Sequence, residues 1–568
     1  MSDKTRLRVV LCWHMHQPQY CDLISGEYRL PWTYLHAIKD YIDMAVHLEA
    51  VPTARAVINF APVLLEQLDD YAAQISGFLR DHKSIRDPLL AALVAPVLPT
   101  RDDRKHELID ACMRVNQRVI ERFPAYQRLA EIAGLYQGHC ADMRYLSEQF
   151  MADLVFWYHL GWIAETVRRS DLRVQRWQEQ GRNFTLHDRR ELLVLIGELL
   201  SGVIDRYSAL AASGQAELSV TPYAHPIIPL MLDISSAREA MPDVQLPELE
   251  AYPGGEQRAH WHIREGLNVF EQYFRHKPAG CWPAEGSVSQ PTLELFEGYG
   301  FRWVATGETV LRNTLGADCG DTAVDAADAV LKGYQVADGK LVCFFRDDKL
   351  SDEIGFNYST WHADDAVANF IHNLENIAGA NAGRELALPI ILDGENAWEH
   401  FPENGYYFLR ALYEKLADHP SLKLSTFTEC LDEGVEIGQL STLVSGSWVY
   451  GTFSTWIGDR DKNRGWDMLG EAKRAFDRTL SQGHLDGDQV VAAQLQLSIC
   501  EGSDWFWWFG DYNPADSVSD FEALFRLHLS NLYELLGVEP PEYLAHTFAR
   551  GSGDPAMGGT MRHGQAYD

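Results

Sequence analysis

The sequence predicts an α/β fold, a distorted (β/α)7 barrel, and two observations support that prediction. Short apolar runs rich in β-forming residues recur along the chain, and helical patterns separate them. Runs that are apolar on both faces are typical of a parallel sheet covered by helices on both sides. Seven such units favour a barrel, and a doubly wound open sheet is the alternative. The runs span residues 7–13, 54–60, 216–221, 279–282, 301–305, 341–345 and 386–392.

The uneven spacing of these runs predicts a long insertion. The second and third runs are separated by residues 61–215, where apolar residues recur at three- and four-residue steps. This period is typical of amphipathic helices. We therefore expect a barrel covering residues 1–410 that carries a helical insertion at about 61–215.

Beyond residue 410 the strand signals mostly stop. Helical patterns dominate 470–482, 489–500 and 520–536, which predicts a C-terminal helical domain at 411–549 that contributes to the cleft. The tail at 550–568 is rich in glycine and has no core pattern. We expect that tail to be disordered.

The net charge of the chain limits the classes of partner that it can bind. There are 49 Lys and Arg residues against 81 Asp and Glu residues, so the formal net charge is -32 at pH 7. Such an acidic chain repels phosphate backbones and anionic lipid surfaces, so we expect neither nucleic acid nor membrane as a partner. A neutral polysaccharide suffers no such repulsion. The 16 Trp residues add flat surfaces of the kind that stack on sugar rings.

Cysteine usage and the N-terminus favour a cytoplasmic protein. The nine cysteines are scattered and include no CxxC pair, so neither a zinc knuckle nor a disulfide framework is indicated. The first residues lack the apolar region and cleavage site of a secretory signal. No apolar stretch is long enough to predict a transmembrane helix. Nothing in the sequence indicates the oligomeric state.

Polar residues follow the predicted strands at the positions where barrel enzymes carry their chemistry. Each of them alone has a structural explanation, such as a helix cap or an ion pair. Together they indicate one polar barrel mouth. The residues are His14 and His16 after the first strand, His225 after the third, Glu285 after the fourth, Arg346 after the sixth and Asp393 after the seventh.

Glu285 and Asp393 form the candidate catalytic pair. Glycoside hydrolysis needs two carboxyl groups flanking the bond, about 5–5.5 Å apart when one of them is the nucleophile. Carboxylates on the fourth and seventh strands of a small barrel can face each other across its mouth. Position at a strand end does not by itself distinguish this pair from Asp347, Glu395 or Asp504.

His14 and His16 are two residues apart at a strand end, so both side chains can point to the same side. That permits two metal ligands, as in zinc hydrolases, with His225, Asp347 or Asp393 completing the set. It equally permits two hydrogen-bond donors to sugar hydroxyls. A pair simply packed in the core is a third interpretation.

Aromatic residues cluster twice in the C-terminal region, at 448–456 and 503–511. Four successive aromatics at 505–508 cannot all face one helix core, because successive residues turn by about 100°. We expect some of them to form a wall of the cleft. For Phe506 and Trp508 we prefer packing at a domain interface.

Taken in order, five of these motifs resemble glycoside hydrolase family 57, whose members act on α-glucans. The resemblance covers the whole chain except the tail. It rests on HMHQP at 14–18, TPYAHP at 221–226, WPAE at 282–285, DGE at 393–395 and SDW at 503–505.

The resemblance implies a seven-stranded barrel with a helical C-terminal domain leaning on the active site. It implies a retaining mechanism without a catalytic metal or cofactor, in which Glu285 is the nucleophile and Asp393 the general acid/base. Asp393 must then start protonated, so we expect burial and the Glu285 charge to raise its pKa. The candidate substrate-binding residues are His14, His16, His225, Trp282, Arg346, Trp398, Trp448, Asp504 and Trp505.

The expected activity is that of an α-amylase or amylopullulanase. It would cleave α-1,4 bonds, with α-1,6 bonds as a further candidate, in glycogen, starch fragments or maltodextrin. A 4-α-glucanotransferase using the same site is the first alternative. A metal-dependent deacetylase or mannosidase using His14, His16 and an Asp is the second, and a non-catalytic glucan-binding protein is the third.

Overall fold

The structure is a computed structural model that describes residues 6–136, 140–319 and 326–553. Its strands form one ten-stranded sheet in the order β10-β6-β7-β5-β4-β3-β2-β1-β8, with β9 paired to β1. All seven predicted runs are strands of this sheet. They are β1 (Leu7–Met15), β2 (Ala56–Phe60), β3 (Ala216–Val220), β4 (Gly280–Cys281), β5 (Trp303–Gly307), β7 (Val342–Arg346) and β8 (Ala387–Asp393).

These seven strands pair in parallel, and the sheet curls until β7 and β8, the first and last of the seven in the sheet order, approach each other. The backbone N–H of Asp347, just after β7, donates to the carbonyl of Pro389 on β8 at 2.9 Å. The Arg346 side chain donates to the Ile391 carbonyl at 2.8 Å. Among the described residues no regular ladder joins β7 to β8. The expected distorted (β/α)7 barrel is thus confirmed, and the alternative of an open doubly wound sheet is not.

Three short strands were not predicted: β6 (Gly333–Val336), β9 (Leu422–Leu424) and β10 (Ile437–Leu440). Strand β9 pairs with β1 and β10 pairs with β6, so the sheet extends beyond residue 410, where the sequence analysis ended the barrel. With three or four residues each, these strands are too short to produce a recognisable apolar run.

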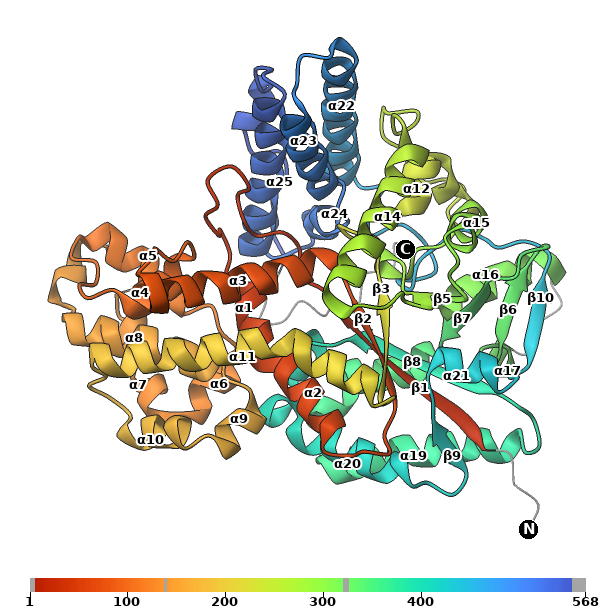
Figure 1. Ribbon diagram of the computed structural model, residues 1–568, viewed down its shortest axis with the longest axis horizontal. Helices are drawn as coiled ribbons and strands as arrows, with labels where there is room; N and C mark the ends of the chain where they lie inside the picture. The colour runs from red at the N-terminus through yellow and green to blue at the C-terminus, as the bar shows by residue number, and fades with distance from the viewer. Residues whose placement is uncertain (1–5, 137–139, 320–325, 554–568) are drawn as a thin grey trace.

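Helices fill the stretch between β2 and β3 and form the lobe at the left of Figure 1. The long helix α11 starts with a capping box, in which Thr185 and Asp188 satisfy each other's backbone N–H groups. The helices are α3 (Pro62–Asp81), α4 (Pro88–Val94), α5 (Asp102–Cys112), α6 (Gln117–Arg122), α7 (Pro124–Gly134), α8 (Glu148–Gly161), α9 (Glu165–Ser170), α10 (Leu172–Gln180) and α11 (Leu186–Ala212).

Helices α22 (Arg460–Gln482), α23 (Gly487–Cys500) and α25 (Ala515–Leu535) stand together at the top of Figure 1, above the short helix α24 (Asp504–Trp508). We call these four helices the C-terminal bundle. Residues 550–553, which we expected in the disordered tail, are placed against the loop that precedes α25. Gly553 pairs there with Pro514, and a Cβ on Gly553 would lie 2.1 Å from the Tyr512 carbonyl oxygen. Residues 554–568 lie outside the described part.

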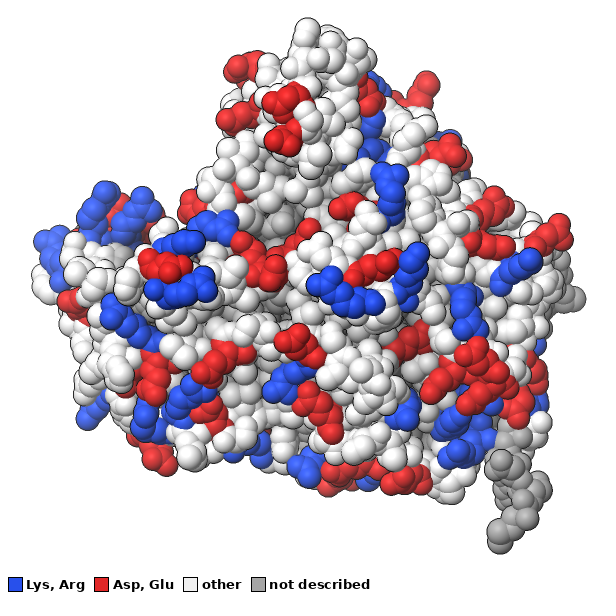
Figure 2. Space-filling model, viewed as in Figure 1, with Lys and Arg blue, Asp and Glu red and all other residues white. Residues whose placement is uncertain are grey.

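The remaining helices surround the barrel. No described helix is both long enough and apolar enough to span a membrane. Acidic and basic side chains are interspersed over the face shown in Figure 2. The helices are α1 (Trp32–His36), α2 (Ile42–Glu49), α12 (Ile228–Leu232), α13 (Ala237–Ala240), α14 (Gly255–Phe274), α15 (Gln290–Gly298), α16 (Glu308–Cys319), α17 (Ala326–Ala329), α18 (Asp348–Asp352), α19 (Ala363–Ala380), α20 (Tyr406–Ala417) and α21 (Phe427–Asp432).

Candidate active site

The carboxyl ends of the barrel strands open into a cavity of about 1070 Å³. Its walls come from the barrel, from residues 113–117 of the helical insertion and from the C-terminal bundle. Three separate parts of the chain therefore meet around one space. Eight of the predicted site residues line it: His14, His16, His225, Glu285, Arg346, Asp393, Trp448 and Asp504.

Glu285 lies on a single helical turn, η4 (Ala284–Gly286), directly after β4. Its φ of 55° is in the left-handed region, which costs a non-glycine residue about 1–3 kcal/mol unless its surroundings hold it there. Trp448 donates two hydrogen bonds that hold Glu285 in this conformation. The Trp448 backbone N–H donates to the Glu285 carbonyl at 3.1 Å, and the indole N–H donates to Glu285 Oε2 at 3.0 Å. The carboxylate is thereby fixed in the cavity by both its backbone and its side chain.

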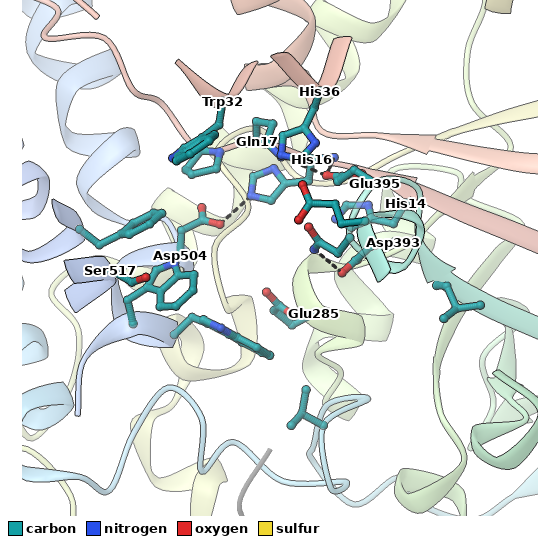
Figure 3. A pocket seen from close by; sticks show the side chains of 18 of the residues that line it. His14, His16, Gln17, Trp32, His36, Glu285, Asp393, Glu395, Asp504 and Ser517 are labelled. Atoms are coloured by element: carbon teal, nitrogen blue, oxygen red, sulfur yellow. Dashed lines mark hydrogen bonds and ion pairs between the residues drawn. The ribbon is translucent and has the colours of Figure 1, made fainter. Parts of the chain in front are cut away.

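Asp393 is the last residue of β8, and its carboxylate points into the same space as that of Glu285 (Figure 3). The Asn396 amide donates to Asp393 Oδ2 at 2.9 Å. Asn396 begins the short helix η7 (Asn396–His400), so the chain turns back immediately after the strand. Strands β4 and β8 thus deliver the two carboxyl groups to one cavity.

Burial raises the pKa of both carboxyl groups. The pKa of Glu285 is raised well above its ordinary value, first by burial and then by the Asp393 charge, against the hydrogen bond from Trp448. Burial also raises the pKa of Asp393, while Asn396, His16 and Arg346 oppose the rise. Because the Asp393 charge disfavours ionisation of Glu285, the two carboxyl groups titrate as a coupled pair.

His14 and His225 belong to a chain of hydrogen bonds between neutral groups. The Asn59 amide nitrogen donates to Ser219 at 3.0 Å, so its oxygen accepts from His14 Nδ1 at 2.7 Å. His14 Nε2 can then accept from His225 Nε2 at 3.2 Å, and His225 Nδ1 accepts from the Ser503 hydroxyl at 2.8 Å. Burial lowers the pKa of His14 to about 3 and that of His225 well below its ordinary value. Both rings are therefore uncharged.

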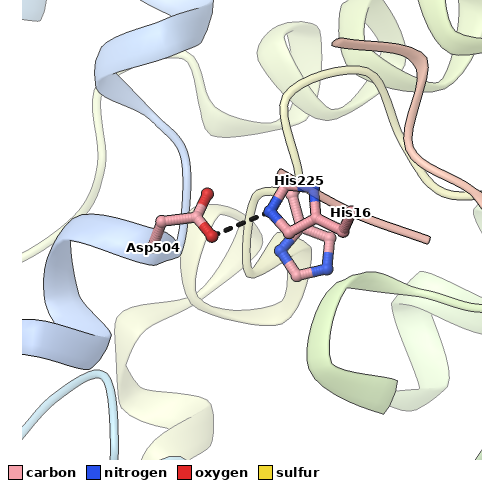
Figure 4. A group of neighbouring side chains, drawn as sticks. All are labelled: His16, His225 and Asp504. Carbon is pink, nitrogen blue, oxygen red and sulfur yellow. Dashed lines mark hydrogen bonds and ion pairs between the residues drawn. The ribbon is translucent and has the colours of Figure 1, made fainter. Parts of the chain in front are cut away.

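His16 joins the barrel to the C-terminal bundle. Its Nε2 is 2.8 Å from the carboxylate of Asp504, the first residue of α24 (Figure 4). Its ring stacks on His225 with the centroids 3.9 Å apart and 19° between the planes. His16 Nδ1 is buried and has no partner among the described residues.

The ligand atoms of His16, His225 and Asp504 lie within 4.8 Å of one another, so we tested whether they fit a metal ion. A metal ion lies in the plane of each imidazole that binds it. The planes of the stacked His16 and His225 rings are nearly parallel, so their lone pairs do not converge on one point. Both nitrogens of His225 are also already hydrogen-bonded. The arrangement suits hydrogen bonding to a hydroxylated ligand better than metal coordination.

Arg346 supports the site from one side. It donates to the Ile391 carbonyl, to Asp348 at 2.8 Å and to Asp352 at 2.6 Å. Its guanidinium lies 5.3 Å from the centre of a Trp448 ring, within the range of a cation–π contact. Arg346 therefore holds in place the tryptophan that binds Glu285.

Trp282, Trp398 and Trp505, which the sequence analysis assigned to substrate binding, do not line the cavity. All three are fully buried and leave no ring face for a sugar. The indoles of Trp398 and Trp505 donate to backbone carbonyls at 3.0 and 2.8 Å. Trp282 packs edge-on against Trp448, with the ring centroids 5.4 Å apart. These tryptophans support the site from the core.

The cavity is also lined by residues that were not selected from the sequence. Glu395 was considered with the catalytic candidates. It accepts from Gln17 at 3.2 Å, and its Oε2 is buried without a described partner. Trp507 and Trp508 line the cavity too, although we preferred an interface role for Trp508. The aromatic cluster at 503–511 was the feature of the sequence that could have indicated that both tryptophans line the cavity. Further lining residues come from distant segments and include Trp32, His36, Trp162 and Glu399.

Comparison with known proteins identifies the family. The pattern described as Glycosyl hydrolase family 57 matches residues 10–440, which is more than half of the chain. The chain belongs to glycosyl hydrolase family 57. The matched segment contains Glu285 and Asp393 but ends before Trp448 and Asp504. Sequence comparison found no match among curated proteins.

Solved structures of family 57 enzymes have the same fold. A branching enzyme from Thermococcus kodakaraensis is 14% identical with a TM-score of 0.56, over 93% of this chain and 90% of that one. The α-amylase of Thermotoga maritima is 14% identical with a TM-score of 0.56, over 95% and 96%. A 4-α-glucanotransferase from Thermococcus litoralis is 12% identical with a TM-score of 0.50, over 94% of this chain and 61% of that one. At these identities the likeness describes the fold.

Proposed function

We propose that this family 57 protein is a retaining enzyme that acts on α-glucans, with Glu285 as nucleophile and Asp393 as general acid/base. The observation that carries the proposal is that two buried carboxyl groups with raised pKa values face one cavity. A coupled pair of buried carboxyl groups suits the acid and the nucleophile of a retaining glycosidase. The α-glucan substrate is supported by the structurally similar amylase, branching enzyme and glucanotransferase.

In the first step Glu285 attacks the anomeric carbon, and the bond from that carbon to the glycosidic oxygen breaks. The proton of Asp393 passes to the departing oxygen, which leaves a glucosyl ester on Glu285. In the second step Asp393 takes a proton from water or from a hydroxyl of a second glucan. The oxygen so activated attacks the anomeric carbon and releases Glu285. Hydrolysis and transfer differ only in this acceptor.

The other polar groups of the cavity bind and orient the sugar. The Asp504 carboxylate, which His16 holds in place, can accept hydrogen bonds from sugar hydroxyl groups, and the hydrogen-bonded pair His14 and His225 shapes the wall beside it. The Trp448 indole favours the ionised form of Glu285, because it donates to the carboxylate. Glycogen, starch fragments and maltodextrin are the proposed substrates.

The roles of the two carboxyl groups are tested by azide rescue. We expect Asp393→Ala to be slow on maltodextrin but to turn over maltosyl fluoride, because fluoride leaves without a proton. Azide should accelerate this variant and give a glycosyl azide of retained configuration. Glu285→Gln should lose activity by about 10³-fold or more and give no retained azide.

Asp347→Asn is the matched control for these variants. Asp347 is also a carboxyl group at a strand end, but it caps α18 through Leu350 and does not line the cavity. We expect this variant to keep most of the activity. Full activity in both Glu285→Gln and Asp393→Ala would contradict the assignment. Activity that is abolished by exhaustive EDTA treatment would favour metal-dependent chemistry.

Glucan transfer is the second candidate function, because the cavity offers polar and aromatic groups well beyond the carboxyl pair. Chromatography of the products from pullulan, amylose and maltotriose separates the two. Release of short sugars alone indicates hydrolysis, and products longer than maltotriose indicate transfer. Binding to glycogen without any product would instead support a non-catalytic protein.

We also propose a cytoplasmic location. Of the nine cysteines, the seven whose side chains the structure describes are unpaired and buried, which fits a reducing compartment. Fractionation of cells that produce the protein, with a cytoplasmic and a secreted marker, checks this proposal.

A further inference from the structure

The cavity has a second polar end that the proposed mechanism does not use. It is formed where α1 passes into the short π-helix η1 (Ala37–Tyr41). His36 lines the cavity with only 6% of its surface exposed, and its Nδ1 is 2.7 Å from the Asp40 carboxylate. Asp40 is fully buried. A carboxylate accepts a hydrogen bond, so Nδ1 carries the proton and Nε2 is left for a ligand.

The surroundings of His36 are those of a binding site. Its Nε2 has no hydrogen-bond partner among the residues that the structure describes. Figure 3 shows the ring beside Gln17, on the same side of the cavity as Trp32. Trp162 also lines this end, edge-on to His36 with the centroids 5.4 Å apart. Two indoles and a carboxylate-oriented imidazole thus border the same space.

The charges at this end favour a neutral ligand. The Lys39 ammonium lies 3.4 Å from Asp40 and 3.6 Å from Glu399, and also sits over Trp162. One buried cation is therefore shared by two carboxylates, so Lys39 has no charge to spare for a phosphorylated or acidic sugar. Aromatic faces combined with hydrogen-bonding groups suit a neutral ring with many hydroxyls. A hydroxyl can bond to His36 Nε2 as donor or as acceptor.

The position of this end relative to Asp393 indicates which sugar it binds. Helix η7 follows β8 and contacts both places. Asn396 on η7 donates to Asp393, and Glu399 on the same helix pairs with Lys39. The His36 end therefore lies on the acid/base side of the cleavage point. In a retaining mechanism that side holds first the leaving group and then the acceptor.

We propose that His36, oriented by Asp40, binds a hydroxyl of a neutral glucosyl unit in an acceptor-side subsite and so favours glucan transfer over hydrolysis. The acceptor-side assignment rests on the proposed function. The binding part of the proposal depends only on the geometry of His36, Asp40 and the two indoles. His36 is a specificity-determining residue here and takes no part in bond cleavage.

His36→Asn is the decisive variant. Its amide nitrogen can replace Nδ1 as donor to Asp40, while the Nε2 atom is removed. With maltotriose we expect the ratio of transfer products to hydrolysis products to fall about fivefold, since one neutral hydrogen bond is lost. Hydrolysis of maltotriosyl fluoride should stay within about twofold of the wild type, because fluoride does not occupy the acceptor side. His36→Gln, which returns an amide near the Nε2 position, should recover part of the transfer.

His47→Asn is the matched control. His47 is likewise buried, but it lies on α2 and outside the cavity, against Tyr406. We expect this variant to keep the wild-type ratio of transfer to hydrolysis. A fall in fluoride hydrolysis equal to the fall in transfer would overturn the proposal, because it would indicate a general loss of structure. An unchanged ratio in His36→Asn would overturn it as well.

A binding measurement separates this proposal from the proposed function. Calorimetric titration of Glu285→Gln protein with maltopentaose needs no turnover. We expect the affinity to fall about fivefold when His36→Asn is added, and not when His47→Asn is added. Equal affinities in all three proteins would overturn the subsite. If the wild type converts no α-glucan but the affinity falls as expected, the proposed function fails and the subsite stands.

Discussion

The cavity is made of two halves that are held in place by different interactions. The barrel half presents Glu285 and Asp393 at the ends of β4 and β8, whose backbones are paired with their neighbours in the sheet. The C-terminal half presents Trp448 and Asp504 after the last strand. Side-chain contacts and isolated backbone hydrogen bonds, rather than a strand ladder, attach it to the barrel. The comparison indicates that the sheet sets the positions of the carboxyl groups, whereas tertiary contacts set the groups that tune them.

A buried ion-pair cluster fastens the two halves together. Glu501, directly after α23, accepts hydrogen bonds from Tyr252 at 2.5 Å, from Arg258 at 2.7 Å and from His262 at 2.8 Å. Arg258 and His262 belong to α14, which packs beside the barrel. Glu501 lies two residues before Ser503, whose hydroxyl bonds to the histidine chain. A change at Glu501 therefore tests whether the bundle is needed to position the site.

The largest effect on stability is expected from Glu501→Gln. Removing one partner of a buried ion pair leaves Arg258 without a counter-charge and costs about 3–5 kcal/mol. We expect the bundle to detach at a lower urea concentration than the barrel unfolds. Tryptophan fluorescence and limited proteolysis during the titration would follow the two events. Glucan affinity should fall even in protein that remains folded, because Ser503 and Asp504 lose their position.

Glu522→Gln is the control, because Glu522 is equally buried but pairs with Arg526 inside the bundle. It should weaken the bundle without loosening its attachment to the barrel. If both variants lowered glucan affinity equally, the Glu501 cluster would have no special role at the junction.

The same cluster predicts how the attachment depends on pH. Although burial alone would raise it, the pKa of Glu501 is lowered from 4.5 to about 2, chiefly by the Arg258 charge. A lowered pKa in the folded state means that the stabilisation is fully present above about pH 4.5. It is lost as the pH falls towards 2. We expect the bundle of the wild type to loosen over this range, and that of Glu501→Gln to show a smaller change.

A smaller effect, on catalysis, is expected from Trp448→Phe. This change removes the indole N–H that donates to Glu285 and lowers its pKa. The pKa of Glu285 should rise further. The acidic limb of the plot of kcat/KM against pH should therefore move to higher pH. We expect a loss of about tenfold near neutral pH, the value of one hydrogen bond to a charged group. Trp507→Phe, at another tryptophan of the cavity, should leave the limb in place.

The two halves also differ in how well the sequence predicts them. The seven barrel strands are apolar runs, and residues at the ends of several of them line the cavity, so strand position and motif agree for His14, Glu285 and Asp393. Trp282, Trp398 and Trp505, which do not line the cavity, stand within five residues of Glu285, Asp393 and Asp504, which do. Neighbours along a strand or helix point to different sides, and the sequence did not show which side faces the cavity.

The second end of the cavity had no signal in the sequence. His36 and Asp40 are four residues apart on a helical segment, which is an ordinary spacing for a surface ion pair. They form part of a binding site only because Trp162 from the insertion and Glu399 after β8 lie beside them, and tertiary folding alone brings these segments together. The strands β9 and β10 escaped prediction because each has only three or four residues, too few for a recognisable apolar run.

The smallest effect is expected where the insertion meets the bundle. Arg114, after α5, pairs with Asp520 on α25 at the margin of the cavity, and both side chains are partly exposed. Partly exposed pairs contribute less than about 1 kcal/mol, so a double-mutant cycle of Arg114→Ala and Asp520→Asn should give a coupling below that value. Urea unfolding measures this coupling, and added salt should reduce it further. A coupling like that of the Glu501 cluster would mean that the insertion and the bundle act as one rigid unit. The cavity would then be held by three fixed walls, and the contrast between a sheet-built half and an attached half would no longer hold.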